Sequence, residues 1–170
     1  HVGDCEAPCQ PSCPANMNIP LMNRLIAAGK FAESLRVVKE DIALPLILGY
    51  ICPAPCEKAC RRGQVDSAVS ICLLKKFVAT EDLKNEEFYL PKKERKSNKK
   101  IAIIGSGPGG LSAAFYSLKF GHDVIIFDKN EKPGGALRYQ ILENQLPNGA
   151  IDKEVEVLIK YGAEFRMNSS

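Results

Sequence analysis

The apolar positions in the first ninety residues recur at intervals of three and four, which is the period of an amphipathic helix. They predict a first helix that ends at Gly29, a second through residues 31–38 and a third through residues 71–78. Ser67 or Ser70 is expected to cap the third helix. No strand-like alternation occurs before residue 100, so this half is predicted to be a small all-helical module.

Two stretches of this half carry no predicted helix. Residues 1–20 are rich in cysteine and proline, and each proline lacks a backbone N–H and biases the preceding residue toward extended backbone. Residues 42–51 are strongly apolar, but Pro45 and Gly49 interrupt them. The remaining apolar core is thin for an independent module, so staples of some kind are expected.

Beyond residue 100, short strand-like runs alternate with helical ones. Strands are predicted at residues 101–104, 124–127 and 163–167, and helices at residues 109–120 and 152–160. Strand, helix and strand joined by short connections indicate a parallel α/β sheet.

The composition is that of an ordinary globular protein of one or two domains: 170 residues, 45% hydrophobic and 25% charged. No apolar run reaches the roughly 18 residues that a membrane-spanning helix needs, and no secretion signal opens the chain. A cytoplasmic location is therefore expected.

The net charge of +3 is concentrated in one short segment. Residues 91–100 carry six lysines and arginines against one glutamate, or +5, whereas residues 1–90 (ten against eleven) and 101–170 (seven against eight) each carry −1. No aromatic residues interleave with these charges, so they do not form a nucleic-acid stacking platform. The segment is interpreted as a solvated linker between two domains, with a docking surface for an acidic electron-transfer partner as the alternative.

The chain contains seven cysteines, all within its first 72 residues. Two triplets have regular spacing and each contains a Cys-Pro pair, and the seventh cysteine stands alone on the third predicted helix. The triplets are Cys5, Cys9 and Cys13, and Cys52, Cys56 and Cys60; the single residue is Cys72.

Three interpretations of these cysteines compete. Disulfides fit poorly with an odd count and no secretion signal. Structural zinc sites usually show C-x2-C pairs, which are absent here. Iron–sulfur cubanes take four thiolates each, and a run ending in Cys-Pro lends its last cysteine to the other cluster of a pair. Two cubanes need eight ligands, so an eighth is expected before His1.

A glycine-rich loop follows the first predicted strand. Gly105, Gly107 and Gly110 form G-x-G-x-x-G between a strand and a helix, which is the dinucleotide-binding fingerprint. The first glycine allows the tight turn, the second lets the backbone approach a pyrophosphate and the third allows close packing of helix on strand. The helix N-terminus then supplies amide donors. Pro108 and Gly109 complete the predicted loop.

The cofactor is expected to extend toward the end of the second strand. Asp128, eighteen residues after Gly110, is predicted to bind the ribose hydroxyls, and its carboxylate disfavours a 2′-phosphate. The glycines alone leave FAD and NAD open. Pro108 and the later run at residues 133–139 favour FAD. Further candidate cofactor-binding residues are Lys129, Gly135 and Leu137.

Together these motifs resemble the small (β) subunit of NADPH-dependent glutamate synthase and its relatives. The relatives include the N-terminal part of dihydropyrimidine dehydrogenase and the large subunit of NADH-dependent ferredoxin:NADP oxidoreductase. The resemblance covers essentially the whole chain, and its most specific pieces are residues 9–16, 52–63, 105–111, 137–139 and 146–147. It implies an α+β two-domain chain: an all-α helical ferredoxin-like cluster domain, then part of a Rossmann-type α/β FAD-binding domain.

The resemblance also implies how the cysteines divide between two [4Fe–4S] clusters. Cys5, Cys9 and Cys60 would hold one, with a cysteine upstream of His1, and Cys13, Cys52 and Cys56 would hold the other. Relatives often complete the second set with Gln or Glu where this chain has Lys75, whose ammonium has no lone pair to give. Cys72 lies three residues earlier on the same helical face and is predicted to be that ligand.

Two departures from the family pattern concern the cluster and flavin regions. The spacing from Cys5 to Cys9 is one residue shorter than usual, and residues 140–143 read Gln-Ile-Leu-Glu where the family has Gly-Ile-Pro-Glu. The family also continues into a second Rossmann domain for NAD(P)H, so the chain is expected to be a fragment.

By the same resemblance, the parent protein transfers hydride from NAD(P)H to FAD and single electrons through the clusters to a partner, such as a large glutamate synthase subunit or a ferredoxin-like acceptor. No catalytic residue is predicted, because no acid–base or nucleophilic side chain carries this chemistry. The alternative function is a non-catalytic scaffold, stapled by a cluster or by zinc, that docks a partner and is inactive alone.

Overall fold

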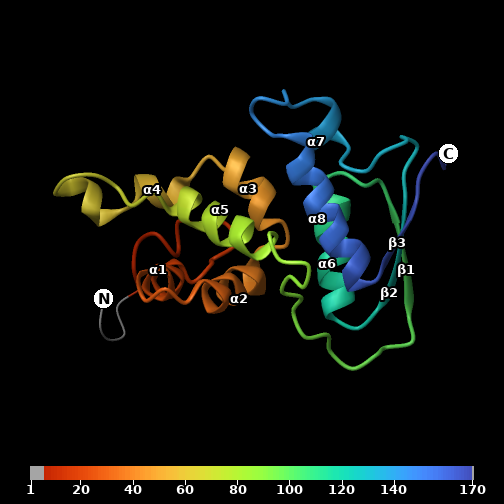
Figure 1. Cartoon of the computed structure of the whole chain (residues 1–170), viewed down its shortest axis with the longest axis horizontal. Coiled ribbons are helices and arrows are strands. Elements are labelled where there is room, and N and C mark those ends of the chain that lie inside the picture. Colours follow the sequence, from red (N-terminus) through yellow and green to blue (C-terminus); the bar gives the residue numbers. More distant parts are fainter. Residues whose placement is uncertain (1–5, 170) are drawn as a thin grey trace. The chain divides into compact units, whose positions relative to one another are not determined.

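The computed structural model describes residues 6–169, and the chain divides into two compact units that meet in the sequence between Tyr89 and Leu90. The first unit is helical and the second is a sheet with helices (Figure 1). In the described residues, no helix is long and apolar enough to cross a membrane.

The described part of the first unit contains helices and no strand. Three of the helices, α1, α2 and α5, confirm the helices predicted from apolar spacing. The elements are α1 (Ile19–Ala27), α2 (Phe31–Asp41), α3 (Pro45–Ile51), α4 (Pro55–Lys58), a 3-10 turn (Arg61–Gln64) and α5 (Ile71–Asp82).

Helix α1 starts and stops where its sequence provides caps. The Asn18 side chain accepts a hydrogen bond from the Leu21 N–H at 3.1 Å, and Gly29, with φ of +72°, ends the helix in a left-handed turn. The apolar faces of α1, α2 and α5 meet in a core that includes Met22, Leu35 and Val78, each at most 1% exposed.

Helix α3 corrects the expectation that Pro45 and Gly49 break the apolar run at residues 42–51. Pro45 occupies the first turn of the helix, where its missing N–H would have no partner in any case. Gly49 lets α3 approach α5, because a Cβ on it would lie 2.5 Å from Cβ of Lys76. Both residues therefore permit the helix and its packing.

Helix α5 is capped differently from the prediction. Ser70 does precede the helix, but its side chain makes no capping hydrogen bond. The Cys72 N–H in the first turn instead donates to the Glu57 carboxylate at 2.8 Å. A residue on α4 thus satisfies one of the free amides of α5.

The second unit has a parallel three-stranded sheet in the order β1-β2-β3. Ile101 of β1 is paired with Val124 of β2, which is paired in turn with Ala163 of β3. The elements are β1 (Lys100–Ile104), α6 (Pro108–Lys119), β2 (Asp123–Phe127), α7 (Ala136–Tyr139), α8 (Asn148–Tyr161) and β3 (Ala163–Arg166). The three predicted strands and two predicted helices are confirmed, and α7 was missed.

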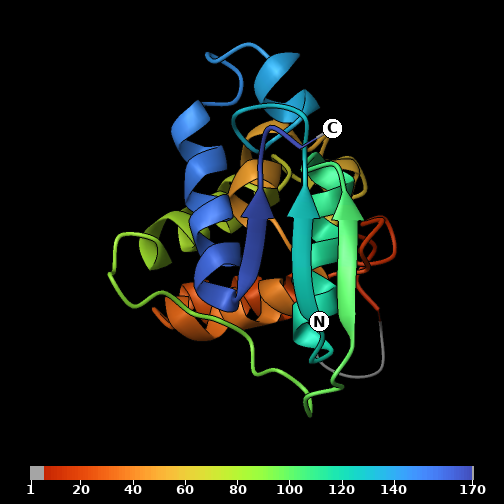
Figure 2. The same ribbon diagram turned by 90° about the vertical axis from the view of Figure 1, so that its right-hand side faces the viewer.

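Helices α6 and α8 lie on one face of this sheet (Figure 2). Between them and the strands lies a core that includes Phe115, Ile126 and Ile151, each of which is fully buried. The outer face is more open, and Ile104 at the end of β1 is 84% exposed. The carboxyl ends of β1 and β2 therefore open toward solvent beside the start of α6.

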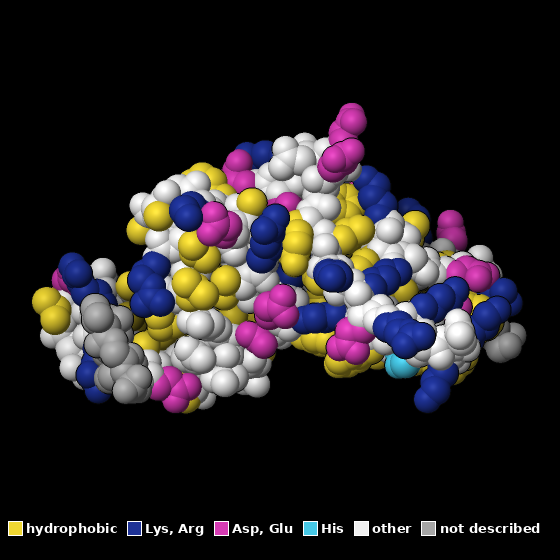
Figure 3. All heavy atoms as spheres, turned by 90° about the horizontal axis from the view of Figure 1, so that it is seen from below, with side chains coloured by type: hydrophobic (Ala, Val, Ile, Leu, Met, Phe, Trp, Pro, Cys, Tyr) yellow, Lys and Arg dark blue, Asp and Glu magenta, His cyan; other side chains and the backbone are white. Residues whose placement is uncertain are grey.

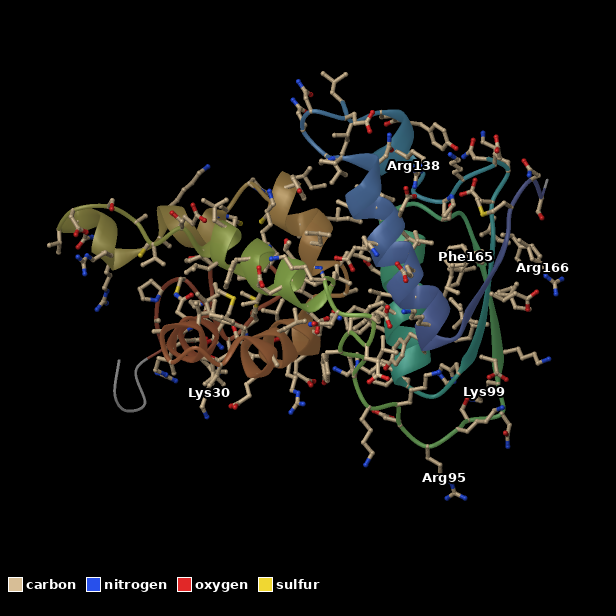
Figure 4. All side chains as sticks on the ribbon, in the orientation of Figure 1. Lys30, Arg95, Lys99, Arg138, Phe165 and Arg166 are labelled. Atoms are coloured by element: carbon tan, nitrogen blue, oxygen red, sulfur yellow. The ribbon has the colours of Figure 1, made fainter. Side chains whose placement is uncertain are left out.

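The basic segment at residues 91–100 packs along the second unit through its backbone. The Glu94 N–H donates to the Lys119 carbonyl at 2.8 Å, and the Ser97 N–H donates to the Gly121 carbonyl at 3.0 Å. Arg95 points away from the ribbon (Figure 4), whereas Nζ of Lys93 lies 5.0 Å from the ring centroid of Tyr161. Lysines and arginines gather over this unit on the face seen from below (Figure 3).

Candidate cofactor sites

The glycine-rich loop connects β1 to α6 in a conformation that requires glycine at two positions. Gly105 has φ of +98°, and its N–H donates to the Phe127 carbonyl of β2 at 2.7 Å. A Cβ on Gly110 would lie 1.9 Å from the Gly105 carbonyl oxygen. The first and third glycines of the motif are therefore used for the turn and for close packing of α6, as their spacing predicts.

Open space lies beside the middle of the loop. A Cβ on Gly107 or Gly109 would meet no atom within 4 Å, and Pro108 starts α6 just behind Gly107. A cavity of about 540 Å³ adjoins the loop at the carboxyl ends of β1 and β2. It is lined by Ile104, Gly105, Gly107, residues 127–130, Gly135 and Ser169.

The second glycine segment lies on this loop. The Gly134 N–H donates to the Ser106 carbonyl at 3.0 Å. Gly135 has φ of +50°, and a Cβ on it would lie 2.8 Å from Cα of Gly107. The structure thus brings together two glycine-rich segments that lie almost thirty residues apart in the sequence.

The predicted cofactor residues fall into two groups. Gly105, Gly107, Asp128, Lys129 and Gly135 line the cavity, whereas the other four predicted residues are absent from its lining. Those four are Pro108, Gly109, Gly110 and Leu137. Gly110 acts through packing of the helix, and Leu137 is a core residue of α7 that is 4% exposed.

Asp128 is a buried carboxylate with a full set of hydrogen bonds. Its Oδ2 accepts from the Ser106 N–H at 2.7 Å and the Ser106 hydroxyl at 2.6 Å, and its Oδ1 accepts from the N–H and side-chain amide of Asn130, both at 2.9 Å. Burial opposes ionisation, but these bonds outweigh it and lower the pKa of Asp128 below its ordinary value. The sequence interpretation missed both partners.

Arg138 fixes the second glycine segment to α8. Its Nε donates to the Pro133 carbonyl at 2.8 Å, its Nη1 donates to Asn148 Oδ1 at 3.2 Å and its Nη2 is paired with Asp152 (Figure 4). The guanidinium is therefore a brace that holds residues 133–139 in place beside the glycine loop.

In the first unit, Cys9 and Cys60 line a cavity of about 270 Å³. Burial and the nearby thiolates of Cys60 and Cys13 raise the pKa of the Cys9 thiol. Asn23 also lines the cavity, and its Oδ1 is buried without a hydrogen-bond partner among the described residues. Cys5, predicted to join Cys9 and Cys60, lies outside the described residues.

A second group of thiols comes from four separate segments. Burial and the charges of Cys13 and Cys52 raise the pKa of the Cys56 thiol. Burial, the charges of Cys52 and Cys56 and a hydrogen bond with Cys52 raise the pKa of the Cys72 thiol to about 12, and Lys75 opposes this rise. The structure thus places Cys72 beside the cysteines with which it was predicted to act.

The cysteines of the first unit fit iron–sulfur cubanes better than a structural zinc site. A cubane takes four cysteine thiolates. Cys56 is influenced by Cys13 and Cys52, and Cys72 is influenced by Cys52 and Cys56. Among residues 6–169, no three His, Cys, Asp or Glu side chains form a group that could hold a single metal ion. The donors and the Cys9–Cys60 cavity are compatible with iron–sulfur clusters.

A cysteine-rich helical unit joined to a Rossmann-like unit with a glycine loop defines the class: a chain with an iron–sulfur domain followed by a nucleotide-binding domain. Comparison with known families agrees. The family described as dihydropyrimidine dehydrogenase domain II, 4Fe-4S cluster, matches residues 3–87, half of the chain, and an NAD(P)-binding Rossmann-like domain matches residues 103–166. The chain belongs to this family, and the predicted resemblance and fold class are confirmed.

Curated relatives resemble nearly the whole chain. It is 35% identical to the NADP(+)-dependent formate dehydrogenase subunit beta of Moorella thermoacetica over 96% of this chain, and 32% identical to the glutamate synthase [NADPH] small chain of Bacillus subtilis over 92%. It is 34% identical to the NAD-dependent dihydropyrimidine dehydrogenase subunit PreT of Escherichia coli over 96%. The matched part is 26%, 32% and 40% of these relatives, respectively.

Proposed function

We propose that this chain is the electron-input part of an NAD(P)H-dependent oxidoreductase. In this proposal, the cavity of the second unit holds the adenosine diphosphate part of FAD, and the cysteines of the first unit hold two [4Fe–4S] clusters. Electrons pass from NAD(P)H through these groups to a redox partner subunit. The observation that carries the proposal is the presence, in one chain, of a cavity lined by the glycine-rich loop and a helical unit whose cysteine thiols influence one another.

The relatives support a role within a larger assembly. Several are named as subunits of oxidoreductases, including those of formate and pyrimidine metabolism. Because their names differ in substrate, the final electron acceptor of this chain is left open in the proposal. A glutamate synthase large subunit and a ferredoxin-like acceptor remain the predicted partner types.

The glycine loop would hold the pyrophosphate of FAD. The free amides at the start of α6 and the positive end of its dipole favour a phosphate group, and the open space beside Gly107 lets that group approach the backbone. Gly135 lies against the same loop and also lines the cavity. FAD, when bound, accepts a hydride and releases electrons one at a time.

Asp128 would orient the ribose. A carboxylate accepts about four hydrogen bonds, and Ser106 and Asn130 already donate four to Asp128. A ribose hydroxyl would therefore replace the Ser106 hydroxyl or the Asn130 side-chain amide as a donor, while the two backbone N–H groups keep the carboxylate oriented. Because its pKa is lowered, Asp128 meets the ribose as an anion.

The cysteines would act as thiolate ligands. Cys13, Cys52, Cys56 and Cys72 would hold one cluster, and Cys9, Cys60 and Cys5 would contribute to the other. Burial raises the pKa of Cys9, Cys56 and Cys72, so iron must displace their protons on binding.

Metal and flavin analysis of the full-length protein, purified without oxygen, tests this proposal. Two cubanes predict about eight iron atoms and about eight acid-labile sulfides per protein. Heat denaturation should release FAD, identified by chromatography. Zinc without sulfide would overturn the cluster assignment, and absence of flavin would overturn the FAD assignment. Failure of NADH and NADPH to bleach the bound flavin would favour the non-catalytic scaffold.

A further inference from the structure

Lys75 is a lysine in the interior of the first unit. It lies on α5, three residues after Cys72, and is only 3% exposed. Lysine is almost never fully buried unless its charge has a partner, because removal of an ammonium from water is costly. A compensating group is therefore expected near the Lys75 ammonium.

Lys39, another buried lysine of this unit, is paired with oxygen atoms. Lys39 is 2% exposed, and its Nζ donates to the Tyr89 carbonyl at 2.7 Å and lies 3.6 Å from the Asp82 carboxylate. Within residues 6–169, Lys75 has no such carboxylate or carbonyl partner. Lys75 instead lies one helical turn after Cys72 on α5, and its charge opposes the rise in the pKa of the Cys72 thiol.

The neighbouring lysine on the same helix is directed elsewhere. Nζ of Lys76 lies 3.5 Å from the ring centroid of Tyr50, and its Cβ packs against Gly49. Two adjacent lysines of α5 therefore have different environments: Lys76 lies over an aromatic ring, and Lys75 lies in the interior, one helical turn after Cys72. This makes Lys76 a matched control for Lys75.

We propose that Lys75 compensates the negative charge of the cluster held by Cys13, Cys52, Cys56 and Cys72, and thereby raises its reduction potential. This inference rests on the proposed function, because it requires a cluster at these thiols. Lys75 acts here as a positioning and tuning residue, since a protonated ammonium has no lone pair with which to bind iron.

The direction of the effect follows from charge. Reduction adds one electron, and hence one negative charge, to a group that four thiolates already make anionic. A nearby cation stabilises the reduced, more negative cluster more than the oxidised one. The effect is large in the protein interior, because charge–charge attraction is screened less there than in water. Net charge and hydrogen bonds to the sulfurs are established determinants of cluster potential.

The same burial could instead reflect packing of the aliphatic stem alone. In that case the loss of the charge would leave the cluster potential unchanged. Lys75→Met keeps most of the stem and removes the charge, whereas Lys75→Arg keeps the charge. Lys76→Met removes a charge from the next residue of the same helix, whose Nζ lies over the Tyr50 ring.

The test is a redox titration of the full-length protein, followed by electron paramagnetic resonance in the absence of oxygen. In Lys75→Met, one of the two clusters should shift to a more negative midpoint potential, while Lys75→Arg and Lys76→Met should retain the wild-type potential. An unchanged potential in Lys75→Met with both clusters intact would overturn the inference, and so would an equal shift in Lys76→Met.

A second measurement covers the case in which Lys75→Met does not fold or load. Wild-type protein labelled with 15N-lysine should show a weak 15N coupling to a reduced cluster by pulsed electron paramagnetic resonance. Absence of that coupling would overturn the inference without any variant. If wild-type protein contains no iron and sulfide, the proposed function itself fails, so the two failures are distinguishable.

Discussion

Gly110→Ala is the substitution for which the structure predicts the sharpest effect on the second unit. The added Cβ would lie 1.9 Å from the Gly105 carbonyl oxygen, 3.0 Å from the Gly105 carbonyl carbon and 3.3 Å from Cγ2 of Ile103. Two of these atoms belong to the backbone, so rotation of a side chain cannot relieve the contact. Either α6 must move away from β1 or the glycine loop must change shape.

The expected cost can be bounded from both sides. Overpacking of a tight site costs about 1–3 kcal/mol, and alanine regains up to about 1 kcal/mol over glycine in a helix. A net loss of about 1–2 kcal/mol corresponds to a fall in melting temperature of roughly 4–16 °C for a unit of this size. Gly105 also lines the cavity, so the FAD content should fall as well.

Gly149→Ala is the matched control. Gly149 also lies in a helix of the second unit, α8, but a Cβ on it would meet no atom within 4 Å. Calorimetry and flavin content should show this variant equal to or slightly more stable than wild type. If Gly110→Ala unfolds at the wild-type temperature and retains its full FAD content, then Gly110 is not required for the close approach of α6 to the loop, and this prediction is refuted.

Three further substitutions test other contacts. Cys72→Ser should lower the iron content from about eight to about four atoms per protein. The control Ser70→Ala removes a side chain with no capping hydrogen bond and should leave the iron content unchanged. Equal iron in both variants would contradict the assignment of Cys72 as a ligand. Asp128→Asn should weaken FAD binding, measured by flavin dissociation, because the anion that accepts from Ser106 and the ribose is lost; unchanged retention argues against the ribose role. Lys39→Met should lower the free energy of unfolding of the first unit by about 3–5 kcal/mol in urea, because the largely buried Asp82 carboxylate loses its cation. A decrease below about 1 kcal/mol would be inconsistent with a buried ion pair.

The spacing of residues was sufficient to predict those elements whose stabilising contacts lie within one short stretch of the sequence. Helix α1 has its cap and its terminating glycine within the segment itself, and the glycine loop joins a strand and a helix that are adjacent in the sequence. Helix α3 was missed because proline and glycine were interpreted as interruptions. Gly49 has meaning only beside Lys76 of another helix, a contact that no local pattern reveals.

The site was predicted to a similar degree. The glycine motif indicated the loop and the position of Asp128, but the hydrogen bonds of that carboxylate come from Ser106 and Asn130, whose residue types are common in any loop. Residues 133–139 were recognised as a motif, yet their place against Gly107 depends on Arg138 and its partners on α8. Such long-range contacts carry no periodic signal in the sequence.

Glu57 illustrates how the first unit joins its cysteine segments before any cluster is considered. Its carboxylate accepts the hydrogen bond of the Cys72 N–H at 2.8 Å, and it follows Cys56 directly in the sequence. One side chain therefore ties α4, which carries Cys56, to the first turn of α5, which carries Cys72, and it replaces the cap that Ser70 does not provide. Contacts of this kind preorganise a set of ligands drawn from separate segments, so less of the metal-binding free energy is spent on ordering those segments. Glu57, which lies between Cys56 and Cys60 in the sequence, is thus part of the architecture of the proposed cluster site without being one of its ligands.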